Sequence, residues 1–407
     1  MKTFFSVCFA LLALFGSCQN KSINSITTPI VLDHNRMLVD AEMQRKDGTW
    51  RKVRLWIDSG SPEFFISESL ARDLGIDLSV TDDITFKGSR FEVQTPPGLK
   101  IGGMNINTDS IGTLVLFQPY WLFSTMHSDG NLPATVLKKY RIVFDYLNQQ
   151  LTIADPGSIK PQGVASAISI HPQTGIIQMD AIIDGEPYSF ALDMGASYSF
   201  ISEGKLAKLS KAHPEWPNIT GTLGCANMWG WWPANEQQFQ VVRIPEIKWG
   251  NTQLDNLGIV GVPDFSSSGP TLGGWYSRKT AKPVDGFIGP NALKAFRVEI
   301  DYDNNTVYLE KGEKSDFEEM DLVGISVRQL PDSNYQVVGI VQENEKLSVS
   351  GIEPEDIIIS IDDFMCKGKT MGSVVDKLRG KPGEKRKIVI NRNDYELTIN
   401  AKVSHFL

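Results

Sequence analysis

The sequence predicts a mainly β protein, made of two related units followed by a smaller α+β module. Three observations lead to this fold class. An aspartate-centred motif occurs twice, each time at the end of an apolar run typical of a buried strand. A second block of residues follows each copy at a fixed spacing. Beyond residue 312 the chain changes to short β-type runs around one helical segment.

The aspartate motif has the same layout in both copies. In each, an apolar run ends at Asp58 or Asp193, small residues form a turn, and Phe-Ile-Ser begins at Phe65 or Phe200. The offsets agree, since 65 − 58 and 200 − 193 are both 7. A single Asp-Ser-Gly is ordinary turn vocabulary and is weak evidence for chemistry. The repetition makes the motif informative.

The second block begins with Asp129-Gly130 in the first unit and with Asp285-Gly286 in the second. A closing Asp-Tyr pair follows each, and Gly130 to Asp145 and Gly286 to Asp301 both span 15 residues (145 − 130 and 301 − 286). Internal repeats of this kind are interpreted before any single motif. A structural duplication without chemistry would also explain the pattern, but coincidence would not.

The order of these elements resembles the retropepsin-like aspartic peptidases. Two copies in one chain resemble the bilobal, pepsin-like arrangement, so a bilobal acid-protease-like β-barrel fold is expected, with lobes at residues 30–160 and 161–312. The resemblance implies that Asp58 and Asp193 form a catalytic dyad at the lobe interface. The expected activity is that of an aspartic-type endopeptidase acting on peptide or protein substrates. No metal, cofactor or nucleophilic Ser or Cys is expected.

Two adjacent carboxylates share one proton, because they cannot both ionise easily. As is known for aspartic proteases, the ionised partner then takes a proton from water while the protonated one donates to the scissile carbonyl. Glycines beside the dyad let the backbone approach closely. The residues expected to support the dyad are Ser59, Gly60, Gly195 and Gly289.

Each unit departs from the family pattern at one position. Met194 stands where a Ser or Thr hydroxyl would bond across to the opposite turn. Pro133 replaces the glycine that Gly289 supplies in the second unit, and because proline fixes φ and removes a donor, a different turn is expected there. These departures keep an alternative open, in which the chain is a catalytically inactive peptide-binding protein on the same fold.

A substrate-covering flap is expected in the second unit, where glycines alternate with the large aromatics Trp229, Trp231 and Trp232. The same tryptophans would equally suit a core or an interface between the lobes. A carbohydrate-binding envelope lipoprotein would use them too, but that class leaves the paired Asp motifs unexplained. The equivalent segment of the first unit, residues 85–90, is shorter and polar.

The N-terminal residues indicate export. Residues 1–17 contain a lysine and an apolar run too short to span a bilayer, which is typical of a signal peptide. Small residues then precede Cys18, which resembles the lipidation site of bacterial lipoproteins; a plain secretory signal is the alternative. The protein is therefore expected in the bacterial cell envelope, lipid-anchored and facing the periplasm or the surface. A net charge of −8 argues against nucleic-acid binding, and two fused units favour a monomer.

Residues 320–405 resemble a bacterial PDZ domain. The resemblance implies that a C-terminal peptide ligand adds a strand to a sheet edge, with its carboxylate held on backbone N–H groups. The residues expected to form that loop and strand are Gly324, Ile325, Ser326 and Val327. In the alternative interpretation the module packs against the other units and only stabilises them.

Overall fold

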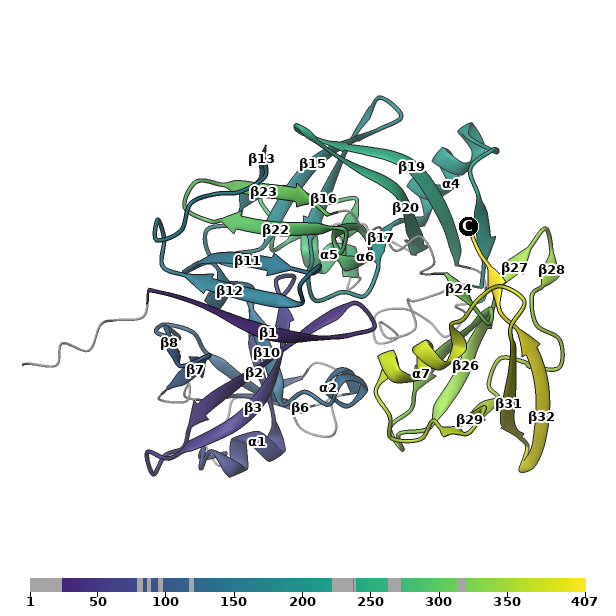
Figure 1. Ribbon diagram of the computed structural model, residues 1–407. Helices are drawn as coiled ribbons and strands as arrows, with labels where there is room; N and C mark the ends of the chain where they lie inside the picture. The colour runs from purple at the N-terminus through teal and green to yellow at the C-terminus, as the bar shows by residue number, and fades with distance from the viewer. Residues whose placement is uncertain are drawn as a thin grey trace, which may run out of the picture.

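The structure of the protein is a computed structural model that describes residues 24–78, 83–85, 89–93, 98–116, 121–221, 237, 239–262, 272–312 and 320–407. The protein is mainly β, with 50% strand and 12% helix, as the sequence predicts. Three parts follow one another along the chain, and the C-terminal one lies beside the other two (Figure 1). Within the described residues, no helix has the length and apolar character needed to cross a bilayer.

The first unit begins at residue 25, before the predicted start at residue 30, and is mostly antiparallel strands with three short helices among its described residues. Its elements are β1 (Ser25–Asp33), β2 (Arg36–Gln44), β3 (Trp50–Asp58), β4 (Phe64–Ser67), α1 (Glu68–Asp73), β5 (Asp83–Thr85), β6 (Ser89–Val93), β7 (Leu99–Ile101), β8 (Met104–Ile106), β9 (Thr113–Leu116), α2 (Trp121–Met126), β10 (Gly130–Pro133), α3 (Ala134–Leu137), β11 (Arg141–Asp145) and β12 (Gln150–Ala154).

The second unit repeats much of this order. Its elements are β13 (Val164–Ala167), β14 (Ser169–Ile170), β15 (Ile177–Ile183), β16 (Glu186–Leu192), β17 (Ser199–Ser202), α4 (Glu203–Ala212), β18 (Asn218–Thr220), β19 (Gln240–Trp249), β20 (Thr252–Val262), α5 (Leu272–Ser277), β21 (Gly286–Ile288), α6 (Pro290–Leu293), β22 (Phe296–Asp301) and β23 (Thr306–Lys311).

The C-terminal module contains a six-stranded sheet, in which β30 pairs with β29 at the side, together with four short strands outside that sheet and one helix. Its elements are β24 (Asp321–Leu322), β25 (Ile325–Gln329), β26 (Tyr335–Ile340), β27 (Gln342–Glu343), β28 (Lys346–Leu347), β29 (Ile357–Ile361), β30 (Phe364–Met365), α7 (Met371–Leu378), β31 (Lys385–Arg392), β32 (Tyr395–Lys402) and β33 (Ser404–His405). The main sheet runs β25-β26-β29-β31-β32, so β25 lies at one edge and β32 at the other.

The sequence repeat corresponds to a repeated arrangement of strands. The strand that leads to each motif aspartate, β3 or β16, pairs in parallel with the short strand of the Asp-Gly block, β10 or β21. On its other side that short strand pairs antiparallel with the Phe-Ile-Ser strand, β4 or β17. Both motif turns are therefore held by the same three-strand scaffold.

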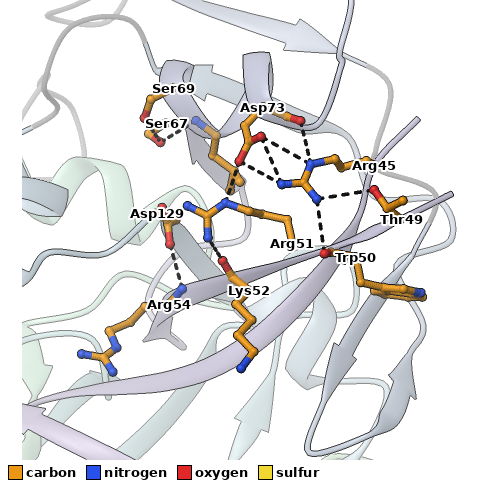
Figure 2. Close-up of polar contacts among 11 residues, drawn as sticks. Arg45, Thr49, Trp50, Arg51, Lys52, Arg54, Ser67, Ser69, Asp73 and Asp129 are labelled. Carbon is orange, nitrogen blue, oxygen red and sulfur yellow. Dashed lines mark hydrogen bonds and ion pairs between the residues drawn. The ribbon is translucent and has the colours of Figure 1, made fainter. Parts of the chain in front are cut away.

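The aspartate of each Asp-Gly block fastens this scaffold. The Asp129 carboxylate accepts the backbone N–H of Arg54 at 2.8 Å, and the Asp285 carboxylate accepts that of Ser189 at 2.9 Å. Arg54 and Ser189 each lie four residues before their motif aspartate. Figure 2 shows the Asp129 contact beside the outer face of β3, where Arg45 and Arg51 both bond Asp73 of α1. Asp129 and Asp285 thus have a structural role.

One antiparallel sheet joins the two units. Its strands run in the order β1-β12-β11-β22-β23-β13, and β11 of the first unit pairs with β22 of the second. At this seam the buried Arg141 guanidinium bonds Glu299 at 2.6 Å and Asp301 at 2.9 Å. Burial of charge is tolerated here because both signs are present.

The C-terminal module docks on both units. Strand β27 pairs with β18 of the second unit, and a single apolar cluster includes Phe239 and Val241 of that unit together with Val337 and Ile340 of the module. On the first unit, the Asp33 carboxylate at the end of β1 accepts the backbone N–H of Gly372, in the first turn of α7, at 3.0 Å. These contacts favour the interpretation in which the module packs against the other units and stabilises them.

Candidate active site

The repeated scaffold brings the two motif aspartates together. Asp58 ends β3, Asp193 follows β16, and each is only 5% exposed. A Cβ atom on Gly60 would lie 2.4 Å from Cγ of Asp193, and one on Gly195 would lie 2.8 Å from Oδ1 of Asp58. Each glycine thus lies against the opposite aspartate, and only a residue without a side chain fits there.

Asp193 is surrounded by donors. Its Oδ1 accepts the N–H groups of Gly195 at 2.8 Å and Ala196 at 3.2 Å, and its Oδ2 accepts the phenol O–H of Tyr276 at 2.5 Å. Burial raises the pKa of Asp193, while these bonds, led by that from Tyr276, and the N–H of Gly60 oppose the rise. Hydrogen bonds to a carboxylate favour its ionised form.

Asp58 has weaker support. Its Oδ2 accepts one amide bond, from Nδ2 of Asn131 at 3.3 Å. Burial, then the neighbouring charge of Asp193, raise the pKa of Asp58 well above its ordinary value, and Glu63 adds to the effect. Two carboxyls whose pKa values are both raised, one of them by the charge of the other, are typical of a pair that shares a proton.

The Ser59 hydroxyl both donates a hydrogen bond to the opposite turn and accepts one from it. Its Oγ donates to the Leu192 carbonyl at 3.2 Å and accepts the Met194 N–H at 2.8 Å. The hydroxyl missing at Met194 removes the reciprocal bond, as the sequence indicates. Instead, the fully buried Met194 sulfur accepts the Tyr146 phenol O–H at 3.3 Å. The Ser59 hydroxyl therefore joins the two turns, and the sulfur contact joins the Asp193 turn to Tyr146, which directly follows β11.

The prediction of a different turn at Pro133 is wrong. Pro133 has φ −81° and ψ 166°, Gly289 has φ −105° and ψ −179°, and each directly precedes a four-residue helix. In the second unit the Gly289 N–H donates to Ser199 Oγ at 3.0 Å. The equivalent of Ser199 in the first unit is Phe64. Proline's missing donor therefore coincides with a missing acceptor, and the extended backbone suits both residues.

Gly289 must nevertheless be a glycine. A Cβ atom there would lie 2.5 Å from the Tyr198 carbonyl oxygen, closer than real contacts allow. Gly289 thus lets the second Asp-Gly block pass close to the strand that follows the Asp193 turn.

Four further side chains connect the elements around the site. The indole N–H of Trp56 donates to the Gly195 carbonyl at 3.0 Å, joining the first unit to the Asp193 turn. The Lys279 ammonium pairs with Glu63 at 2.5 Å and also lies 4.8 Å from the ring centroid of Trp275. Helix α5, which carries Tyr276, is therefore held near the Asp58 turn.

Sequence reasoning did not identify Asn131 or Tyr276 as site residues. Asn131 carries a usable signal, because it is polar where the repeat has Phe287. Tyr276 carries none, since it lies outside both repeated blocks. Only the folded chain brings its phenol to Asp193.

The predicted peptide-binding loop is already engaged within the chain. Gly324, Ile325, Ser326 and Val327 are all buried. The Gly324 carbonyl accepts the Val341 N–H at 2.9 Å, and the Ser326 hydroxyl donates to the carbonyl of Gly221 in the second unit at 3.0 Å.

The predicted flap residues Trp229, Trp231 and Trp232 and the predicted lipidation site Cys18 lie outside the described residues. Among the side chains that the structure does describe, no group of three or more His, Cys, Asp or Glu is placed to hold a metal ion.

No protein-family model matches the chain, and no curated protein is significantly similar to it.

Proposed function

We propose that the protein is an aspartic endopeptidase in which Asp58 and Asp193 form the catalytic dyad. The observation that carries this proposal is the crossed approach of two equivalent turns, in which Gly60 lies against the buried Asp193 and Gly195 lies against the buried Asp58. Burial of two carboxyls is costly. A fold that retains such a pair in a repeated scaffold is typical of a functional site. The resemblance of the sequence to retropepsin-like peptidases, and the sheet that joins the two repeated units through β11 and β22, support the same activity.

The chemistry follows from the shared proton. The ionised carboxylate accepts a proton from a water as its oxygen attacks the scissile carbonyl carbon, and the protonated carboxyl donates to the carbonyl oxygen. When the C–N bond of the resulting tetrahedral intermediate breaks, the carboxyl that took a proton from water gives it to the amine nitrogen. The other carboxylate takes a proton from a hydroxyl of the intermediate, which restores the original proton of the dyad. The crossed contacts of Gly60 and Gly195 and the two bonds of Ser59 hold the carboxyls in register for this exchange.

For the C-terminal module we propose a PDZ-like role in recognising peptides or protein tails. Its first long strand, β25, lies at a sheet edge, which is the arrangement that strand addition requires. The buried loop at Gly324–Val327 makes docking on the other units a second role of the module, and the contacts of Ser326 with Gly221 and of Asp33 with Gly372 favour it.

The N-terminal pattern supports an exported, lipid-anchored protein of a bacterial envelope, with Cys18 as the modified residue. Metabolic labelling with a fatty acid tests this: label should enter the wild-type chain and be absent from Cys18→Ser. Equal labelling of both chains would overturn the anchor.

The activity is tested by incubating the chain from Lys21 onward with a diverse peptide library between about pH 4 and 8. A peptide-like transition-state analogue serves as inhibitor, because it should bind far more tightly than substrate. Analogue-sensitive cleavage supports the proposal. Saturable peptide binding with no product after long incubation would instead identify the inactive peptide-binding alternative.

A further inference from the structure

Tyr276 makes a contact that the repeat does not provide for. It lies in α5, a helix of the second unit, and its side chain is buried, with the ring 5.5 Å from that of Phe287 and 5.0 Å from that of Trp275. Its phenol oxygen lies 2.5 Å from Oδ2 of Asp193. A Cβ on Gly60 would also lie 2.4 Å from this oxygen, so the phenol reaches the contact between the two turns.

The contact makes the dyad asymmetric. Asp193 accepts bonds from Gly195, Ala196 and Tyr276, so both of its oxygens have a donor within 3.2 Å. Among the described residues Asp58 has one side-chain donor, Asn131, at 3.3 Å, and the backbone N–H of Gly60 also favours its charged form. A phenol donates one hydrogen bond and has no tendency to accept a proton from a carboxylic acid. Donors on both oxygens stabilise a carboxylate and leave the proton of a shared pair to its partner.

We propose that Tyr276 is a positioning residue that keeps Asp193 the ionised member of the dyad, so that Asp193 takes the proton from water and Asp58 carries the proton given to the carbonyl oxygen. This inference rests on the proposed peptidase function and adds a division of roles to it. Tyr276 acts through Asp193 and forms or breaks no bond to the substrate.

Removal of the phenol oxygen should change how the dyad titrates. In Tyr276→Phe the ring still packs against Phe287, but Asp193 loses its only side-chain donor among the described residues. Since that bond favours the charged form, its loss raises the pKa of Asp193. Activity needs the ionised carboxylate, so the acidic limb of the pH profile of kcat/KM should move to higher pH. We expect kcat to fall about tenfold, as for loss of one hydrogen bond to a charged group, with a smaller change in KM.

The experiment uses the full chain, with the aspartate carboxyl carbons labelled with ¹³C and the Asp193 signal assigned by its absence in Asp193→Asn. We expect the Asp193 carboxyl to lose its proton at lower pH than that of Asp58 in the wild type. In Tyr276→Phe the Asp193 titration should move to higher pH together with the acidic limb. Tyr302→Phe is the matched control, because the buried Tyr302 hydroxyl has no hydrogen-bond partner within the described part of the chain. Its titration and pH profile should follow the wild type.

Each result decides the matter. An Asp193 titration that Tyr276→Phe leaves unchanged, or a wild type in which Asp58 ionises first, would overturn the role of Tyr276. Absence of cleavage by the wild type at every pH would instead overturn the peptidase function, and the titration would still report on Tyr276. A near-ultraviolet circular dichroism spectrum like that of the wild type excludes misfolding as the cause of a change.

Discussion

Ser59 and Met194 occupy equivalent positions after the two aspartates, yet they stabilise the inter-unit contact in different ways. Ser59 uses its hydroxyl to bond the opposite backbone at two atoms. The backbone N–H of Met194 donates to that same hydroxyl, and the Met194 sulfur accepts the Tyr146 phenol O–H. At Met194 a sulfur contact with Tyr146 therefore stands in place of the hydroxyl bond to the opposite turn, while the two bonds of Ser59 remain.

A consequence is that placing a hydroxyl at position 194, as in retropepsin-like peptidases, should not stabilise the protein. Met194→Thr would shorten a fully buried side chain and leave the Tyr146 phenol without its acceptor. Cavity formation and an unsatisfied polar group together should lower the free energy of unfolding by roughly 2–4 kcal/mol. Urea unfolding measures the change. A threonine variant as stable as the wild type would show that the sulfur contact contributes nothing.

The dyad also sets a pH dependence of stability. Burial and Asp193 raise the pKa of Asp58 in the folded state. The folded state therefore holds the proton over a pH range where the unfolded state has lost it, and stability falls as pH rises through that range. Asp58→Asn removes this cost. We expect the variant to melt at higher temperature than the wild type at pH 7, by roughly 2–4 °C, and to lose the advantage at acid pH.

Calorimetry of both proteins from about pH 3 to 8 tests this sign. The matched control is Asp40→Asn, whose carboxyl is 73% exposed, and its effect should be small at every pH. A wild type that melts at a higher temperature than Asp58→Asn at pH 7 would show that ionisation of Asp58 does not destabilise the folded state.

At the scale of single residues, the sequence predicted the groups that the repeat marks and missed those it does not. Asp58 and Asp193 are found because each ends an equivalent strand. Asn131 breaks the repeat with a polar residue and could have been found by comparing the two copies. Tyr276 could not, because its contact depends on where α5 packs after the fold has formed.

At the scale of elements, the turn between β1 and β2 contacts both the second unit and the C-terminal module. Asp33 pairs with the buried Arg36 at 3.1 Å and bonds the Gly372 N–H of the C-terminal module. Asn35 donates to the Ser197 carbonyl at 3.1 Å, four residues after Asp193 in the chain. One turn thus contacts α7 and the segment that leaves the Asp193 turn.

Asp33→Ala should be strongly destabilising, because it leaves the Arg36 guanidinium buried without its carboxylate. Breaking a buried pair by removing one partner costs about 3–5 kcal/mol. Asp40→Ala is the control, since its pair with Arg54 is exposed and should contribute less than about 1 kcal/mol. Chemical unfolding of both variants measures the difference. Equal, small losses would mean that the turn does not hold the module.

Element patterns in the sequence predicted the strands but not their docking. The apolar runs before Asp58 and Asp193 indicate β3 and β16, but the pairing of β3 with β10 and of β16 with β21 is seen only in the folded chain. The turn at Pro133 can match its counterpart because Phe64 offers no hydroxyl to accept the N–H that proline lacks. Nothing in the sequence of the β1–β2 turn indicated its distant partners, since its bonds to Thr125, Ser197 and Gly372 reach residues more than 80 positions away.

Over the whole molecule, the three parts share sheets and core. The antiparallel sheet through β11 and β22 belongs to both repeated units, and the second unit continues into the C-terminal module through β18 and β27. Apolar side chains of the second unit and of the module form one cluster. Composition indicated three segments in order, but which surfaces they bury against one another is a property of long-range packing.

Shared cores should make unfolding cooperative. We expect one calorimetric transition for the full chain, with a calorimetric enthalpy close to the van't Hoff value. A chain ending at Gly312 should lose stability and expose Ile219 and Phe239, which pack in the shared cluster, so it should bind a hydrophobic dye. Two well-separated transitions in the full chain would contradict this coupling.

We propose that Asp58 and Asp193 act together on a peptide bond. The most direct measurement compares peptide-library cleavage by the wild type, Asp58→Asn, Asp193→Asn and the exposed control Asp40→Asn, all shown to be folded. The account predicts cleavage by the wild type and by Asp40→Asn, and none above background by either dyad variant. Cleavage that persists in both dyad variants, or a folded wild type that cleaves nothing between about pH 4 and 8, would contradict it.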